Sequence, residues 1–448
     1  MNGNSLRARE RRLVLRRWLR PGIGIKRWLL VAFVGEVLLA IAAALVLRPL
    51  LAQGRPDTGS PDLLDIVTLQ FLDPGVRVFV FFAVGGLLFV YGGWRVLRAL
   101  VEPYRMSDEP LADLLYQRRL RARGPRIVAI GGGTGLSVLL RGLKQVTSNI
   151  TAVVTVADDG GSSGKLRTEM GVPPMGDIRM CIAALADAEP AMSSLLAYRF
   201  PAGNGHDQHF AGHAFGKLLI AALTDVSGDF EEAVRQSNRV LAVRGSVVPV
   251  AGTPITLHAR LDDGSTLEGE SHIERARGIE SIWITPDDVR PTAEALTAIA
   301  NADIVVIGPG SLYTSLLPPL LVPGMREALG ATGAARLFVC NVATQLGETE
   351  GYGLARHLAA LAAHGLTGMI DAVLVNSNTH ARQLPGDPAA PVTLDVEPRR
   401  ASLPIIVSRD VVDDDNAHRH DSRKLSAAIL DLYEDGTDLR RDPIAAAS

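Results

Sequence analysis

The stretch that decides the fold reads Arg126-Ile127-Val128-Ala129-Ile130-Gly131-Gly132-Gly133-Thr134-Gly135-Leu136. Apolar residues lead into glycines, and a segment with helical apolar periodicity follows. This order predicts a buried strand, a tight glycine turn and the first turn of a helix. Backbone N–H groups in such a turn, together with the positive end of the helix dipole, favour an anion. We therefore predict that a phosphate group binds at Gly131, Gly132, Gly133, Thr134 and Gly135.

The glycine spacing matches neither of the two common nucleotide-binding motifs. Leu136 occupies the place of the third glycine in a dinucleotide fingerprint, and no Gly-Lys-Ser/Thr triplet of a P-loop follows. The alternative to a phosphate loop is a turn whose glycines serve only close packing.

From Arg126 onward, short apolar runs alternate with helical periods, and this alternation predicts an α/β fold. Residues 255–285 break the alternation around Asp263-Gly264, a hairpin signal, and predict a small antiparallel insertion. We expect a Rossmann-like, doubly wound, mostly parallel sheet, whose ligands bind at the carboxyl ends of its strands. The predicted strands are 126–130, 150–156, 246–250, 303–307, 336–341, 370–375 and 404–408. The predicted helices are 134–145, 176–186, 212–224, 229–242, 292–300, 312–329, 353–364 and 420–434.

Two apolar runs precede this domain, Trp28 to Leu47 and Val76 to Leu97. Each is long enough to cross about 30 Å of hydrocarbon. Arginines are dense before the first run and after the second, whereas the connector carries two arginines and four aspartates. The positive-inside rule therefore predicts a transmembrane hairpin in the cell membrane, with both termini and the main domain in the cytoplasm.

Glu36 stands near the middle of the first apolar run. A charge at that depth is costly, so it is neutralised or faces a partner helix. A proton path is one interpretation. We favour a packing contact with the second run, because Gly85-Gly86 and Gly92-Gly93 permit close approach.

These patterns divide the 448 residues into five segments. The segments are a basic N-terminus (1–27), two transmembrane helices with a short external loop (28–102), a charged linker (103–125), the ligand-binding domain (126–436) and a tail (437–448).

The formal charge of −2 gives no sign of a nucleic-acid partner, and two cysteines indicate reduced thiols rather than a disulfide framework.

Polar residues follow several other predicted strands. Aspartates and serines after the second strand suit a ribose, a phosphate or a divalent cation, or simply cap a turn. An Asp–Arg pair and a histidine stand at the starts of two later helices. The candidates are Asp158, Asp159, Ser162, Ser163, Asp177, Arg179 and His213.

The second half of the domain adds a further glycine loop and two amide-bearing strand ends. Amide side chains there suit recognition of a base or of sugar hydroxyls. Arg419 and His420 stand where they can reach a diphosphate. The candidates are Gly310, Ser311, Tyr313, Asn341, Gln345 and Arg419.

Five motifs in this order resemble those of the YvcK-type gluconeogenesis factors, relatives of CofD, the 2-phospho-L-lactate transferase of deazaflavin coenzyme synthesis. The resemblance covers residues 126 to 436, and the two apolar runs are an addition to the common cytosolic form. Lys217 and Met180 stand where this family usually has asparagine. The motifs are residues 130–137, 156–164, 176–179, 308–315 and 341–345.

The resemblance implies a Rossmann-like fold that binds UDP-N-acetylglucosamine, with a role in cell shape and wall-precursor metabolism during growth on gluconeogenic carbon. It also implies which residues meet the ligand. The diphosphate and sugar would contact Gly132, Gly133, Thr134, Ser162, Ser163 and Ser311, and Tyr313, Asn341, Gln345 and Arg419 would complete the site.

We expect a regulatory binding protein that requires no cofactor, forms a homo-oligomer and contacts regulators of cell-wall synthesis. One alternative is a CofD-like transferase with a nucleotide donor and Mg²⁺ on Asp158, Asp159 or Asp177. A dinucleotide oxidoreductase ranks last, because the glycine spacing does not fit it.

Overall fold

The computed structural model describes residues 26–51, 72–101, 119–160, 164, 167, 171–187, 189–201, 212–382, 389–396 and 404–434. The chain forms two compact units, Met1–Leu115 and Tyr116–Ser448. We call them the N-terminal unit and the soluble unit and describe each on its own.

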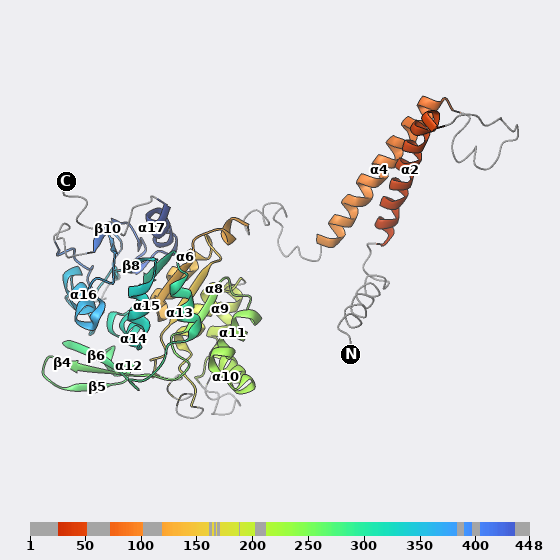
Figure 1. Cartoon of the computed structure of the whole chain (residues 1–448). Helices are drawn as coiled ribbons and strands as arrows, with labels where there is room; N and C mark the ends of the chain where they lie inside the picture. Colours follow the sequence, from red (N-terminus) through yellow and green to blue (C-terminus); the bar gives the residue numbers. More distant parts are fainter. Residues whose placement is uncertain are drawn as a thin grey trace, which may run out of the picture. The chain divides into compact units, whose positions relative to one another are not determined.

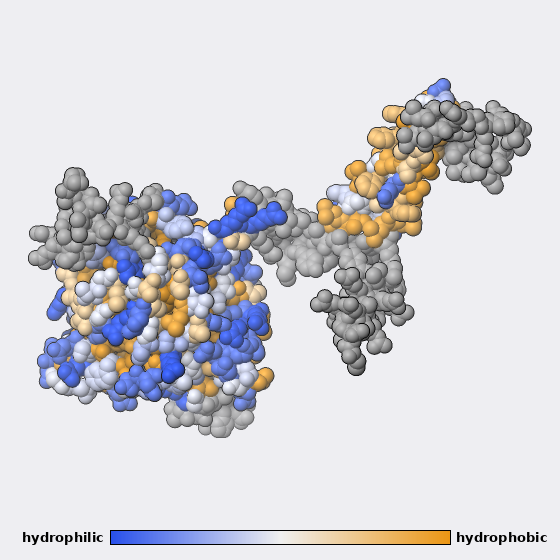
Figure 2. Space-filling model, in the orientation of Figure 1, coloured by the Kyte–Doolittle hydropathy of each residue, from blue (hydrophilic) through white to orange (hydrophobic). Residues whose placement is uncertain are grey.

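The N-terminal unit contains two long apolar helices that pack side by side, α2 (Lys26–Leu51) and α4 (Pro74–Val101). Glycines allow the close packing: a Cβ added at Gly85 would lie 2.9 Å from the Gly35 carbonyl oxygen, and one at Gly92 would lie 2.6 Å from the Ala32 nitrogen. Apolar side chains cover most of the visible surface of the pair (Figure 2). The apolar stretches Arg27–Val46 (20 residues) and Pro74–Arg98 (25 residues) make both helices long enough to cross a membrane.

The soluble unit is built on a seven-stranded sheet in the order β10-β9-β8-β7-β1-β2-β3, and every pairing is parallel. All seven predicted strands are confirmed. They are β1 (Ile127–Gly131), β2 (Ile150–Val154), β3 (Ser246–Pro249), β7 (Ile304–Ile307), β8 (Ala335–Val339), β9 (Ala372–Asn376) and β10 (Ile405–Arg409).

Helices cover both faces of this sheet, as the alternating pattern predicts (Figure 1). On one face α6 (Gly133–Leu143) packs on β1 and against α8 (Gly176–Leu185) and α17 (Ser422–Glu434). On the other face α13 (Ala293–Ala300) packs on β2 and β3, and α14 (Leu317–Leu321) packs on β1. The central strands β1 and β7 are therefore buried along their whole length.

Residues 255–285 form the predicted antiparallel insertion, which Figure 1 shows as a separate small sheet. Its strands are β4 (Thr256–Leu261), β5 (Thr266–Glu268) and β6 (Ile279–Thr285), in the order β5-β4-β6, and α12 (Glu270–Ile273) lies between β5 and β6 in the chain. Asp263 accepts hydrogen bonds from the Ser265 amide (2.8 Å) and hydroxyl (2.6 Å), and Gly264 takes φ +83°. The Asp-Gly pair thus forms the turn that the sequence indicates.

One long helix predicted over 312–329 is wrong. The segment contains a π-helical turn η2 (Leu312–Leu316), α14 and α15 (Met325–Ala331). Proline lacks a backbone N–H and cannot continue a helix, and Pro323-Gly324 separates α14 from α15, with Gly324 at φ +96°.

The helix predicted over 420–434 begins two residues later, because a β-hairpin precedes it. β11 (Val412–Asp413) pairs with β12 (Asn416–His420), and Asp421 then caps α17 by accepting hydrogen bonds from the amides of Arg423 and Lys424, both at 2.8 Å. The remaining elements are α9 (Glu189–Ala197), α10 (Phe215–Ser227), α11 (Phe230–Val240), α16 (Leu354–Leu361) and η3 (Ala362–Leu366).

Candidate functional site

The order of the strands reverses between β1 and β7, and a cavity of about 360 Å³ opens beside their carboxyl ends. In doubly wound sheets this switch point is where ligands bind, because the connections on either side diverge to opposite faces. The cavity is lined by Thr134, Gly135, Val138, Pro309, Gly310, Ser311, Asn341, Val342, Ala343, Thr344, Gln345, Leu346, Ala389, His418, Arg419 and His420. We call this space the switch-point cavity.

The glycine turn after β1 brings the start of α6 against the loop after β7. Gly133 takes φ +65°, a conformation that favours glycine. A Cβ added at Gly135 would lie 2.6 Å from the Pro309 carbonyl oxygen and 3.0 Å from the Gly310 Cα. Gly135 therefore sets the distance between two walls of the cavity.

The loops after β7 and β8 are fixed to each other by side-chain amides. Asn341 accepts a hydrogen bond from the Gly310 amide at 3.2 Å and donates one to the Gly310 carbonyl at 2.9 Å. Ser311 donates to the Gln345 side-chain oxygen at 2.8 Å. Asn341 thus positions the glycine loop, while Ser311 and Gln345 present polar groups to the cavity.

Arg419 and His420 reach the same cavity through the packing of α17 on α6. The two helices meet at Gly142, where an added Cβ would overlap the Ser422 carbonyl and lie 2.7 Å from the Ser426 hydroxyl. The strand β12, which precedes α17, also contacts α6, and its residues His418, Arg419 and His420 line the cavity together with Thr134, Gly135 and Val138. Arg419 is exposed and brings a positive charge to the cavity.

His420 differs from Arg419 in its surroundings. Burial lowers the pKa of His420 to about 4, against a smaller opposing effect of its hydrogen bond with the Cys340 backbone. The imidazole is therefore neutral at physiological pH. His420 lines the cavity beside Arg419, so its contact with a diphosphate stays a prediction, with a neutral imidazole as the contacting group.

Several other predicted residues form a buried charged cluster on the far side of the glycine turn. The Asp177 carboxylate lies against Gly132, where an added Cβ would overlap it. Burial, and then the Asp158 carboxylate, raises the pKa of Asp177 to about 7. Burial lowers the pKa of Lys217; the Asp158 carboxylate opposes this shift, and the Arg179 guanidinium adds to it.

Glu270 of α12 joins this cluster from the small sheet. Burial, followed by repulsion from Asp158 and Asp177, raises the pKa of Glu270 to about 9. No sequence pattern pointed to Glu270, because only the folding of the insertion brings it beside loops more than ninety residues away. The cluster concentrates titratable groups with shifted pKa values, a feature common at functional sites and also found in structural ion networks.

Comparison with known proteins identifies the family. The family described as "2-phospho-L-lactate transferase CofD" matches residues 127–412, from β1 into β11. The chain belongs to the CofD family. The matched range contains the three strand-end loops of the switch-point cavity.

The most similar family members include proteins named gluconeogenesis factor, so the resemblance seen in the sequence is confirmed. The one from Bacillus subtilis is 45% identical over 317 residues, 69% of this chain and 99% of that protein. The one from Halalkalibacterium halodurans is 45% identical over 311 residues, 68% of this chain and 95% of that protein. A relative from Nostoc sp. is 44% identical over 433 residues, 93% of this chain, so its similarity extends into the N-terminal unit.

A crystal structure of a UPF0052-family protein from Bacillus halodurans superposes with a TM-score of 0.63 and 42% sequence identity. It covers 69% of this chain and 99% of that chain. The fold is thereby confirmed. The soluble unit of this CofD-family member corresponds to a complete protein in that relative.

The structure corrects the role expected of Tyr313. Its side chain is 2% exposed, and its hydroxyl lies 3.2 Å from the Tyr352 hydroxyl and 3.4 Å from the Ile279 carbonyl. Burial and the contact with Tyr352 raise the pKa of Tyr313 well above its usual range. Tyr313 packs beneath the loops and does not line the switch-point cavity.

Two further predicted residues that the structure describes, Gly131 and His213, do not line the cavity. Gly131 belongs to β1, where its carbonyl accepts from the Thr155 amide at 3.0 Å. His213 is buried, and its carbonyl accepts from the Phe200 amide at 3.1 Å. Ser162 and Ser163 lie outside the described residues.

The aspartates proposed for Mg²⁺ are not arranged as a metal site. Among the residues that the structure describes, no three His, Cys, Asp or Glu side chains are grouped to hold a metal ion. Asp159 is used locally: it accepts a hydrogen bond from the Ser271 amide at 2.9 Å. Mg²⁺ on Asp158, Asp159 or Asp177 therefore stays a prediction, and we derive no reaction step through it.

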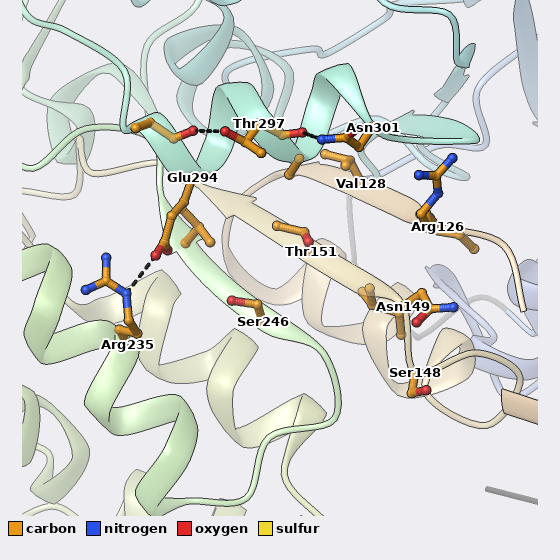
Figure 3. Close-up of a pocket in the computed structure, with 15 residues that line it drawn as sticks. Arg126, Val128, Ser148, Asn149, Thr151, Arg235, Ser246, Glu294, Thr297 and Asn301 are labelled. Carbon is orange, nitrogen blue, oxygen red and sulfur yellow. Dashed lines mark hydrogen bonds and ion pairs between the residues drawn. The ribbon is translucent and has the colours of Figure 1, made fainter. Parts of the chain in front are cut away.

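A second, larger cavity of about 520 Å³ lies at the opposite, amino-terminal edge of the sheet (Figure 3). It is lined by residues from β1, β2, β3 and α13. Arg235 of α11 pairs with Glu294 at its side (2.7 Å), and Asn301 donates to the Thr297 carbonyl at 2.8 Å. None of the glycine loops contributes to it, so we place the candidate site in the switch-point cavity.

Proposed function

We propose that the soluble unit binds a UDP-sugar, UDP-N-acetylglucosamine above all, in the switch-point cavity and acts as a regulatory protein. One observation carries this proposal: three strand-end loops and Arg419 converge on a single cavity at the switch point. A cavity of about 360 Å³ falls within the range of small-molecule sites.

The chemistry of each wall suits one part of such a ligand. The N-cap of α6, Gly132, provides no side-chain cap, so the first turn with Thr134 and Gly135 is suited to a phosphate. Arg419 supplies the charge that complements a diphosphate. Ser311 and Gln345 supply hydroxyl and amide groups for the sugar or the base.

We expect Arg419→Ala to weaken UDP-N-acetylglucosamine binding by about 10- to 100-fold, because a charge-assisted hydrogen bond is worth about 1.5–3 kcal/mol. The measurement is isothermal titration calorimetry on residues 116–448, a unit that corresponds to a whole protein in relatives. Arg423→Ala is the matched control, because Arg423 is exposed on α17 and does not line the cavity. Absence of binding to any UDP-sugar at millimolar concentration would reject the proposal.

A transferase is the second candidate, because the CofD family carries that name. The buried cluster of Asp158, Asp177 and Glu270 offers titratable groups, although the described residues provide no metal site. Turnover of a nucleotide–phospholactate donor with Mg²⁺, lost in Asp159→Asn, would favour the enzyme. Tight UDP-sugar binding without turnover would favour the regulator.

We further propose that the N-terminal unit anchors the protein in the cell membrane as a two-pass hairpin, with the soluble unit in the cytoplasm near regulators of wall synthesis and cell shape. Aromatic and basic residues gather at one end of the hairpin. The Trp28 and Tyr91 rings lie 5.6 Å apart, and the Arg95 guanidinium lies 4.1 Å from the Trp28 ring. Aromatic belts mark both interfaces of membrane helices, and an excess of arginine favours the cytoplasmic one.

This topology predicts opposite labelling of two exposed positions. In spheroplasts, an impermeant maleimide should label Asp73→Cys, at the start of α4, and should not label Arg119→Cys, which begins the described part of the soluble unit. The native Cys181 and Cys340 are buried and should stay silent until the protein is denatured. Labelling of Arg119→Cys alone would invert the orientation, and recovery of the protein in the soluble fraction would exclude the anchor.

A further inference from the structure

The orientation of Glu36 on the hairpin differs from the one expected. The seam between α2 and α4 is set by Gly35 and Gly85, whose backbones are in contact. Glu36 is the next residue after Gly35 and is exposed on the outside of the pair. The prediction that Glu36 packs against α4 is therefore wrong.

Two glycines of α4 lie on the same side of the hairpin as Glu36, one helical turn from the exposed Phe82 and Phe89. Each residue turns an α-helix by 100°, so in an antiparallel pair the residues that follow Gly35 and Gly85 point to the same side. Gly86 and Gly93 face open space, because a Cβ added at either would meet no atom within 4 Å. We define the Glu36 face as Glu36, Ala40 and Ala43 of α2 with Gly86 and Gly93 of α4.

The described side chains of α2 and α4 offer no charged partner for this carboxyl near mid-span. Glu36 is the tenth residue of the 20-residue window Arg27–Val46. Among the described side chains of both windows, the other charged groups are Arg27, Arg77, Arg95 and Arg98, all near the ends, and Arg95 stacks on Trp28. A lone carboxyl facing lipid tails is costly even when it is neutral, and a hydrogen-bonding group from outside this hairpin would lower that cost.

We propose that a second copy of this chain docks on the Glu36 face, so that the two Glu36 carboxyls meet across a two-fold axis in the membrane. An isologous contact places the same patch opposite itself. A carboxylic acid both donates and accepts a hydrogen bond, so two copies satisfy each other where lipid tails cannot. Gly86 and Gly93 let the backbones approach closely. The inference rests on the membrane anchor proposed above and not on the identity of the ligand.

The test is oxidative cross-linking of the full chain in native membrane vesicles, in a background with Cys181 and Cys340 replaced by Ala. Ala40→Cys lies on the Glu36 face, and Val34→Cys, 42% exposed on the opposite side of α2, is the matched control. We expect a disulfide dimer for Ala40→Cys at least tenfold more abundant than for Val34→Cys. Ala43→Cys serves as a second reporter should Ala40→Cys perturb insertion.

The role of the carboxyl is tested within the Ala40→Cys chain. Glu36→Leu should reduce the cross-linked dimer at least tenfold, whereas Glu36→Gln, which still donates and accepts, should retain it. Equal cross-linking at residues 34 and 40, a dimer that survives Glu36→Leu, or cross-links only to other proteins would overturn the proposal. Each variant is also extracted from the vesicles at alkaline pH. A variant that resists extraction but gives no cross-link has lost the dimer, whereas a variant that is extracted has lost the anchor.

Discussion

Gly142→Ala lowers the free energy of unfolding of the soluble unit by about 1–3 kcal/mol, the usual cost of overpacking. In the middle of an isolated helix this substitution would stabilise, because alanine has the higher helix propensity. Here the added methyl group would overlap the Ser422 carbonyl and crowd the Ser426 side chain, whose Cβ would lie 2.8 Å from the methyl carbon. Because the neighbour is backbone, α6 and α17 have to move apart.

The same substitution should weaken UDP-sugar binding, because α6 and β12 form two walls of one cavity. Urea unfolding followed by circular dichroism measures the stability, and calorimetry measures the binding. Gly330→Ala in α15 is the matched control: no atom lies within 4 Å of its added Cβ, so we expect a gain of about 0.5–1 kcal/mol. Equal effects at both glycines would contradict the close contact between α6 and α17.

Asp177→Asn stabilises the soluble unit at pH 8 by up to about 4 kcal/mol and has little effect near pH 4. Burial and the Asp158 carboxylate raise the pKa of Asp177 from 3.8 to about 7. Between these values the folded protein holds a proton that the unfolded chain has released, so stability falls as the pH rises from about 4 to about 7. Asparagine resembles the neutral carboxyl throughout and keeps an oxygen for the Gly133 amide.

The measurement is the difference in unfolding free energy between Asp177→Asn and the parent at pH 4, 5, 6, 7 and 8. The difference removes the contributions of carboxyls that do not interact with Asp177, whereas the contribution of Glu270, whose pKa Asp177 helps to raise, changes with the substitution. Asp263→Asn is the control of opposite sign, because hydrogen bonds from Ser265 lower the pKa of Asp263, so its charge stabilises above the unfolded value. A constant difference across the pH range would show that Asp177 is ionised throughout.

Local pattern fixed the elements of this fold with little ambiguity. Strands such as Ile127–Gly131 and Ile304–Ile307 are buried on both faces, so they are short runs of apolar residues that no helix period explains. The glycine turns, the Asp263-Gly264 hairpin and the two long apolar helices follow equally from residues that are neighbours in sequence. The predictions are wrong where two local signals conflict. In segment 312–329 the apolar periodicity predicts one long helix, whereas Pro323-Gly324 ends it.

The candidate site could be predicted only in part. Thr134, Gly135, Gly310, Ser311, Asn341, Gln345 and Arg419 follow strands or precede helices, and all seven line one cavity. Tyr313 belongs to the same motif, yet its side chain turns into the core, because direction along a helix depends on packing partners that a motif does not contain. Glu270 belongs to no motif, so the sequence did not predict its place in the charged cluster. Its neighbours there come from loops that are distant in the chain.

The sequence by itself determined an α/β sheet with glycine loops at its strand ends, behind a hairpin long enough to span a bilayer, because strand length, helix period and turn chemistry are local properties. Only the tertiary structure decided which loops share a cavity, that His420 is neutral and that Glu36 faces outward. Burial, pKa and side-chain direction depend on neighbours that come together only when the chain is folded.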